Sequence, residues 1–297
     1  MTTRHVALRG PLDLAATLGT LVHGLGDRTI RLRPREAWLA MRLARGTATL
    51  RLRLLAPTEL EATAWGAGTD EALDGVPALV GELDEPERLV PHHPLLRELA
   101  RRHAGLRMPR TRRVFAALVP SIIEQKVTGT EAFRAYAAIL RAHGEPAPGP
   151  AGLLLPPTPE TLAGLPYHAY HPLGLERRRA DVIRAAARRA AWLEGSTDAA
   201  EAARRLASLP GVGPWTVAEV LRVSHGDPDV VSVGDFHVPN SIAWALAGEP
   251  RATDARMLEL LEPYRGQRGR VQRLIEVARI TAPRYGPRME PRSIEAI

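Results

Sequence analysis

The sequence contains no cysteine and a single lysine, Lys126, among its 297 residues. The absence of cysteine excludes disulfides, zinc–thiolate sites and cysteine-ligated iron–sulfur clusters. No apolar run is long enough to span a bilayer, and the first residues, MTTRHVALRG, lack the apolar stretch of a signal peptide. We therefore expect a soluble, cytoplasmic protein that has no membrane partner.

The chain is basic, with a formal net charge of +7 carried almost entirely by arginine. A positive balance suits a polyanionic partner such as nucleic acid. Many basic proteins bind no nucleic acid, so charge alone raises this expectation only modestly. The length accommodates about two domains with their own cores.

The first ninety or so residues show a mixed pattern. Residues 11–26 have helical spacing, and four short β-prone runs follow: TIRLRP, AWLAMRL, TATLRLRLL and LEATAW. The third run alternates, with one set of side chains on each face (Leu50, Leu52 and Leu54; Arg51 and Arg53). This pattern predicts a small antiparallel sheet with one solvated face. A short helix near 70–83 then leads to a domain boundary near residue 88.

From His92 onward the pattern is helical. We expect helices at 93–103 and 111–125, the second capped by Thr111 and kinked at Pro120. The spacing from Thr128 to Glu131 predicts a capping box. A loop rich in proline and glycine, residues 144–159, separates this group from a long helix at 176–195.

The segment LPGVGPWTVAEV interrupts two helices with a turn whose tip has no polar side chain. Gly211, Val212 and Gly213 can offer a partner only their backbone, and Pro214 suits a first helical position. Exposed amides at a helix N-terminus form an anion site that fits a DNA phosphate. The alternative is a tight helix–helix turn that binds nothing. We place this hairpin at residues 206–222.

Asp235 lies in the segment VVSVGDFHVPN, after a β-prone apolar run and ahead of a helix that opens near Pro239. A carboxylate near a helix N-terminus is stabilised as its anion. Taken alone, an aspartate at this position is more often an ordinary helix cap. The loop at residues 226–240 becomes informative only in combination with the hairpin upstream.

Together, the hairpin and the segment GDPDVVSVGDFH resemble the helix-hairpin-helix DNA glycosylase superfamily, and within it the 3-methyladenine type. The match covers most of the chain. It is strong at the hairpin and Asp235, moderate around ALVPSIIEQKVTG, and only architectural before residue 90. The resemblance implies an α+β protein: an antiparallel domain like half of the TATA-binding fold (1–88), then a two-lobed all-α domain (89–297).

The resemblance further implies a base excision repair enzyme that hydrolyses the N-glycosidic bond of alkylated purines in duplex DNA. Asp235 is then the catalytic carboxylate, and Trp215 either belongs to the pocket for the flipped base or packs between the two hairpin helices. Bifunctional relatives carry a Schiff-base lysine where Trp215 stands, so no lyase activity is expected. The family implies no cofactor, a structural monovalent cation on the hairpin carbonyls, a monomer, and association with the bacterial nucleoid through DNA.

Further candidates come from the same resemblance. Gln125 and Lys126 match the loop that fills the gap left by the flipped base; a leucine is common there, so Lys126 departs from the pattern. Two alternatives to this gap-filling role are that Lys126 contacts a DNA phosphate, or that it is an exposed lysine without a role. Glu219 is either a second pocket carboxylate or the partner of Arg222 three residues later.

The remaining candidates are aromatic and basic. They comprise pocket aromatics (Tyr167, Tyr170), phosphate contacts at a helix start (Arg177, Arg178, Arg179) and hairpin contacts to DNA (Gly211, Val212, Gly213, Thr216). The pair His168 and His171 has no cysteine or carboxylate cluster beside it, so we predict no metal site. Two other functions stay open: a non-catalytic DNA-binding or damage-sensing protein, and a glycosylase for deaminated or oxidised bases.

Overall fold

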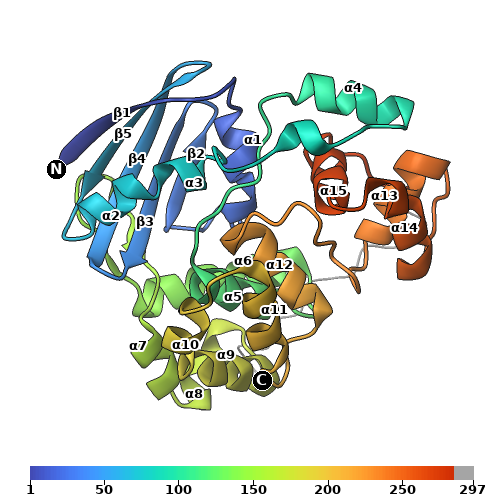
Figure 1. The fold of residues 1–297 in the computed structure, drawn as a ribbon. Coiled ribbons are helices and arrows are strands. Elements are labelled where there is room, and N and C mark those ends of the chain that lie inside the picture. Colours follow the sequence, from blue (N-terminus) through green and yellow to red (C-terminus); the bar gives the residue numbers. More distant parts are fainter. Residues whose placement is uncertain (284–297) are drawn as a thin grey trace.

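The computed structural model describes residues 1–283 (Figure 1). The last residues of the predicted helical domain, 284–297, lie outside the described part. An antiparallel sheet occupies one end of the molecule, and two groups of helices lie below and beside it. The α+β class expected from the sequence is confirmed. Within residues 1–283, no helix is long and apolar enough to cross a membrane.

The sheet has five antiparallel strands in the order β1-β5-β4-β3-β2. Their bounds are β1 (Thr2–Ala7), β2 (Ile30–Arg33), β3 (Glu36–Leu43), β4 (Gly46–Ala56) and β5 (Glu59–Trp65). The last four match the four predicted runs. The first was not predicted, because β1 is an edge strand whose side chains are mostly exposed and carry no apolar alternation.

One face of the sheet packs on short helices: α1 (Leu14–Leu18), α2 (Thr69–Asp74) and α3 (Val76–Leu79). Leu50, Leu52 and Leu54 point into this core, as the alternation predicted. The first helix is much shorter than the predicted 11–26. It gives way to a 3-10 turn at Gly19–Leu21, after which the chain turns at Gly24 with φ +81°.

The other face of the sheet is not simply solvated, so that prediction was wrong. Trp38 and Trp65 stack at 5.3 Å on this face, and Arg51 lies over the Trp38 ring. The predicted proline- and glycine-rich loop folds back onto it through the short strands β6 (Glu145–Pro146) and β7 (Leu154–Leu155). Arg42 fixes the loop by donating its Nε–H to the Pro156 carbonyl at 2.6 Å.

The first helical lobe has one large core, built from helices that follow one another in sequence. These are α5 (Val114–Ile123), α6 (Gly129–His143), α7 (Pro159–Gly164), α8 (Tyr167–Tyr170), α9 (Arg177–Ala187), α10 (Ala190–Glu194), α11 (Ala199–Ala207) and α12 (Pro214–Ser224). The single helix predicted at 176–195 is therefore two helices. Pro120 lies inside α5.

The second lobe joins segments that are far apart in the sequence (Figure 1). Its helices are α4 (Pro94–Arg102), α13 (Val238–Ala247), α14 (Asp254–Leu261) and α15 (Arg268–Val277). Short 3-10 turns complete the described chain (Pro86–Arg88, His171–Leu173, Glu262–Tyr264). A buried ion pair between Asp84 and Arg270 ties the segment after α3 to this lobe.

The start of α5 shows why one cap was mispredicted. The helix begins at Val114, and the Glu194 carboxylate on α10 accepts hydrogen bonds from the amides of Val114 and Phe115, both at 2.9 Å. A distant side chain therefore caps this helix in place of Thr111. The capping box of Thr128 and Glu131 is local, and it is confirmed.

Candidate active site

The hairpin between α11 and α12 holds two glycines for different reasons. Gly211 has φ +88°, and a Cβ there would lie 2.4 Å from Cγ2 of Val182 on α9, so packing within the chain requires glycine. The Val212 side chain is buried in the first-lobe core. A Cβ on Gly213 would meet no atom within 4 Å. The space beside Gly213 is therefore open and leaves room for a partner.

Several amides at this tip are unused. Among the described residues, no acceptor lies against the N–H groups of Gly213, Trp215 or Thr216, which surround the first turn of α12. Unpaired amides at a helix N-terminus carry partial positive charge. The tip is thus suited to binding an anion through its backbone.

The loop after α5 is fastened to the hairpin. Gln125 donates its side-chain N–H groups to the Gly211 carbonyl at 3.0 Å and to the Thr216 hydroxyl at 2.8 Å. Thr216 is buried, so both of these side chains are occupied inside the protein. Lys126 is exposed and adopts φ 56°. It is therefore the long side chain that this loop presents to solvent beside the hairpin.

The basic start of α9 adjoins the same loop. Arg177 and Arg178 are exposed, and Arg177 lies 4.5 Å from the ring centroid of Tyr167. Arg179 differs from its neighbours: it is buried and donates to the Ile123 carbonyl at 2.6 Å, at the end of α5. Its expected role as a phosphate contact is therefore wrong, because its guanidinium joins α9 to α5.

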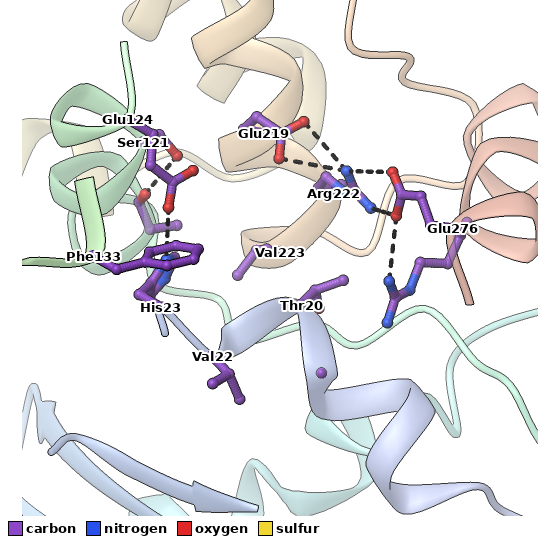
Figure 2. A pocket seen from close by; sticks show the side chains of 13 residues that line it. Thr20, Val22, His23, Ser121, Glu124, Phe133, Glu219, Arg222, Val223 and Glu276 are labelled. Carbon is purple, nitrogen blue, oxygen red and sulfur yellow. Dashed lines mark hydrogen bonds and ion pairs between the residues drawn. The ribbon is translucent and has the colours of Figure 1, made fainter. Parts of the chain in front are cut away.

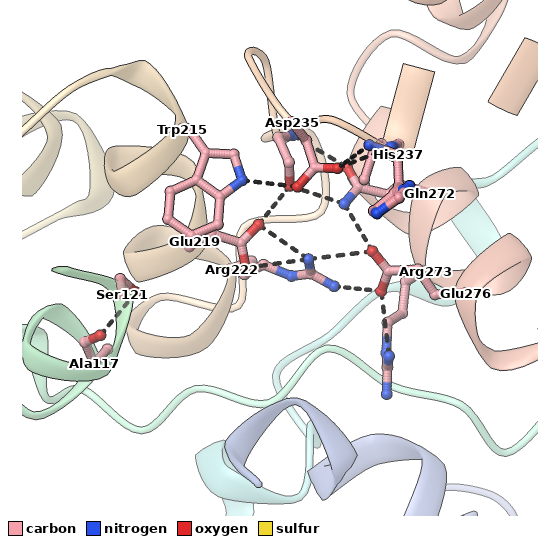
Figure 3. A network of polar contacts seen from close by, with 12 residues as sticks. Ala117, Ser121, Trp215, Glu219, Arg222, Asp235, His237, Gln272, Arg273 and Glu276 are labelled. Atoms are coloured by element: carbon pink, nitrogen blue, oxygen red, sulfur yellow. Dashed lines mark hydrogen bonds and ion pairs between the residues drawn. The ribbon is translucent and has the colours of Figure 1, made fainter. Parts of the chain in front are cut away.

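Asp235 receives three hydrogen bonds (Figure 3). Its Oδ1 accepts from the amides of His237 at 2.7 Å and Val238 at 2.9 Å, at the start of α13. Its Oδ2 accepts from the indole N–H of Trp215 at 3.0 Å. The apolar run before it forms no strand; Val231 packs into the second-lobe core instead. These bonds hold a half-buried carboxylate in place between the two lobes.

A polar network continues from this point along α12 (Figure 3). Glu219, one turn after Trp215, accepts a hydrogen bond from the Ser232 hydroxyl and pairs with Arg222 at 3.2 Å. Burial raises the pKa of Glu219, although Arg222 opposes the shift. Burial also opposes ionisation of Glu276, yet the Arg222 guanidinium at 2.6 Å lowers the pKa of Glu276 to about 2.

A cavity of about 200 Å³ lies where the sheet domain and both helical lobes meet (Figure 2). Side chains from α5, α6, α12, α15 and residues 19–23 line it. Figure 2 shows His23 and Phe133 on one side and the pair of Arg222 and Glu276 on the other. Since Glu219 also lines the cavity, α12 connects this space with the Trp215–Asp235 contact.

The four residues predicted to form the base pocket lie in different parts of the structure. Only Glu219 lines the cavity, while Trp215 contacts Asp235. Tyr170 is fully buried in the first-lobe core and donates its hydroxyl to the Leu162 carbonyl at 2.6 Å; burial raises its pKa to about 12. Tyr167 packs against Arg177 and does not line the cavity. Assigning Tyr170 to the pocket was therefore wrong.

Sequence reasoning missed other cavity residues. His23 follows the short N-terminal helix, Glu124 is the C-cap residue of α5, and Glu276 lies on α15. The Arg222–Glu276 and His23–Glu124 pairs each join segments distant in sequence. No local motif marks such pairs, because only tertiary packing brings them together.

Comparison with known proteins agrees with this geometry. Residues 119–265 match the model of the HhH-GPD superfamily of base excision DNA repair proteins. Over 146 residues (48% of this chain), the sequence is 30% identical to a probable bifunctional transcriptional activator/DNA repair enzyme AlkA of Mycobacterium tuberculosis. Over 148 residues (47%), it is 28% identical to a putative DNA-3-methyladenine glycosylase, YfjP, of Bacillus subtilis. These matches span 29% and 50% of the relatives' own lengths.

Solved structures extend the likeness to the whole fold. The 3-methyladenine DNA-glycosylase of Archaeoglobus fulgidus superposes with a TM-score of 0.78 at 19% identity, over 93% of this chain and 98% of that one. An 8-oxoguanine glycosylase/lyase of Clostridium acetobutylicum gives 0.60 at 13% identity, over 85% and 99%. The hairpin, Asp235 and the two-lobed helical domain fall within this shared fold. Residues 119–265 of the chain therefore belong to the HhH-GPD superfamily of base excision DNA repair proteins.

Proposed function

We propose that this protein is a monofunctional DNA glycosylase that hydrolyses the N-glycosidic bond of alkylated purines, such as 3-methyladenine and 7-methylguanine, in duplex DNA. The observation that carries the proposal is the placement of Asp235. Three N–H donors hold its carboxylate beside the open-tipped hairpin, and one of them, the Trp215 indole, lies on α12 one helical turn before the cavity-lining Glu219.

In this mechanism Asp235 acts on the sugar. Cleavage of the glycosidic bond develops positive charge on C1′, and a fixed carboxylate stabilises that oxocarbenium-like state. The same carboxylate can orient the attacking water. An alkylated purine is already cationic as a leaving group, so it departs without a general acid. One carboxylate is then sufficient for the reaction.

The hairpin and its neighbours would hold the DNA. The unpaired amides of Gly213, Trp215 and Thr216 suit a phosphate, which fixes register without reading sequence. Lys126, Arg177 and Arg178 add exposed positive charge. The target nucleotide must leave the helix to reach the carboxylate, and the cavity beside α12 would receive its base.

The proposal includes no lyase step. Trp215 stands where bifunctional members of the superfamily carry their Schiff-base lysine, and the one lysine of the chain is Lys126. Borohydride in the presence of substrate DNA should therefore trap no covalent complex, and no strand cleavage should precede alkali treatment. A trapped complex that disappears in Lys126→Arg would overturn this part.

We propose no cofactor for the reaction and a monomer as the working form. The backbone carbonyl oxygens of the hairpin suit a structural monovalent cation. The Leu209 carbonyl accepts one hydrogen bond, from the Val212 N–H, and the Gly211 carbonyl accepts one from the Gln125 side chain. Each carbonyl oxygen has a second lone pair that is available to a cation. Bound there, a cation would stabilise the turn and add positive charge near a DNA phosphate.

The decisive experiment is base release from methylated duplex DNA by the wild type and Asp235→Asn, at protein concentrations giving equal DNA occupancy. The proposal requires that the wild type release 3-methyladenine or 7-methylguanine and that the variant bind DNA without release. Unchanged release by the variant would remove Asp235 from the mechanism. DNA binding without release by either protein would favour a non-catalytic role or a deaminated or oxidised base, and assays on hypoxanthine and 8-oxoguanine duplexes would separate these.

A further inference from the structure

We infer that His23 and Glu124 form the part of the cavity that selects a cationic purine, with Glu124 attracting the positive charge and His23 accepting a hydrogen bond from the exocyclic amino group. This rests on the proposed glycosylase function. It assigns a role to the sheet domain, which contributes His23 to the cavity wall.

The other charges of the cavity wall balance each other. Glu219 and Glu276 both contact Arg222, and Glu276 also pairs with Arg273 at 3.2 Å. Two carboxylates thus face two guanidinium groups, all four lining the cavity. Each charged group in this half of the wall therefore has a partner of opposite sign.

Glu124 is not balanced in this way. Across the described residues its contact is with His23, whose Nδ1 lies 2.9 Å from its Oε1, and no arginine or lysine pairs with it. Its side chain is three-quarters buried, at 25% exposure. With His23 neutral, Glu124 is therefore the cavity carboxylate that has no cationic partner among the described residues. A partly buried carboxylate interacts with a nearby cation much more strongly than one in bulk water.

The carboxylate also sets the tautomer of His23. An ionised carboxylate only accepts hydrogen bonds, so Nδ1 must carry the proton, and Nε2 of the neutral ring is then an acceptor. In the described structure Nε2 has no partner. The backbone N–H of His23 donates to Asp27 at 3.0 Å, and the ring packs edge-on against Tyr136 at 5.2 Å. His23 is thus held in one place with its acceptor free.

An acceptor at this position suits both methylated purines. Adenine carries its amino group on C6 and guanine on C2, and each donates hydrogen bonds. Hypoxanthine has no exocyclic amino group and no positive charge. The two residues together therefore favour 7-methylguanine and 3-methyladenine over hypoxanthine, by charge at Glu124 and by hydrogen bonding at His23.

The test compares single-turnover release of 7-methylguanine and hypoxanthine from otherwise identical duplexes. Glu124→Gln keeps the shape and removes the charge, and we expect it to lower 7-methylguanine release at least about tenfold relative to hypoxanthine release. His23→Phe should reduce release of the amino-bearing base selectively. Glu85→Gln, at an exposed ion pair with Arg88, is the matched control and should change neither rate. A ratio that stays constant in both cavity variants overturns the inference and leaves the proposed function standing.

A second measurement keeps the two proposals separable. If the wild type releases no methylated base, the proposed function is wrong, and nucleoside binding by calorimetry at pH 7 decides the inference. The cationic 7-methylguanosine should bind at least about tenfold more tightly than guanosine, and Glu124→Gln should abolish the difference. Equal binding of the two nucleosides, or binding of neither, overturns the inference. Thermal unfolding of each variant checks that the fold is intact.

Discussion

Trp215 donates its indole N–H to Oδ2 of Asp235 at 3.0 Å, so the hairpin helix and the loop before α13 are joined at the carboxylate. The sequence resemblance suggested Trp215 as an aromatic platform for the base. The structure gives the indole a further part, because its N–H points to Asp235 and restricts how the ring can turn. The side chains of Trp215 and Asp235, twenty residues apart in the sequence, thus hold each other in position.

Replacing Trp215 with Phe retains an aromatic ring and removes this hydrogen bond. A hydrogen bond to a charged group contributes about 1.5–3 kcal/mol, so we expect single-turnover base release to fall roughly 10- to 100-fold with DNA affinity little changed. Trp192→Phe, a half-exposed tryptophan on α10, is the control. Equal rates in wild type and Trp215→Phe would show that the indole N–H does not position Asp235.

The two hairpin glycines should respond differently to alanine. Gly211→Ala introduces a clash with Val182 at φ +88°, so we expect a loss of stability of about 1–3 kcal/mol. Gly213→Ala meets open space at φ −99° and should fold normally, but weaken DNA binding by crowding the approach of a phosphate. Denaturant unfolding and DNA titration separate the two effects. Normal DNA affinity in Gly213→Ala would contradict a backbone contact at the tip.

Gln125 and Lys126 are neighbours with separable effects. Gln125→Ala removes two hydrogen bonds to the hairpin and should cost about 1–2 kcal/mol of stability. Lys126→Ala should leave the free energy of unfolding unchanged. It should reduce the slope of log Kd against log salt by about one unit, because one phosphate contact is lost. The check is log Kd against log salt, with unfolding curves in parallel. An unchanged salt slope in Lys126→Ala would exclude a phosphate contact.

Glu276 should make the protein sensitive to acid. Its pKa in the folded protein, about 2, lies below the ordinary 4.5, so its ionisation stabilises the fold fully above pH 4.5, and this contribution is lost as the pH falls toward 2. Glu276→Gln should reduce the unfolding free energy by about 2–3 kcal/mol at pH 7, with the difference from wild type shrinking below pH 4.5.

Urea unfolding of wild type and Glu276→Gln at several pH values between 7 and 3 measures this difference. Glu98→Gln, from an exposed ion pair with Arg102 on α4, should show little change at any pH. A stability difference that is the same at pH 7 and pH 3 would assign the loss to packing instead of charge.

Local sequence determined a good part of this protein. The strict alternation in TATLRLRLL set the buried face of β4, because successive side chains of a strand point to opposite faces. The Thr128–Glu131 capping box and the glycine-rich hairpin are local as well, since each depends on hydrogen bonds or backbone angles within a few residues. The residues flanking Asp235 likewise indicated a carboxylate at a helix start.

Only the tertiary structure decided what surrounds that carboxylate. Tyr170 looks like a pocket aromatic in sequence but is in the core, because helix packing, and not residue type, decides which face of α8 is buried. Conversely, His23 and Glu124 are separated by 101 positions and become neighbours only when the sheet domain packs against α5. The chain's local chemistry thus determined the hairpin and its aspartate, whereas the cavity arises from contacts between segments that no local pattern connects.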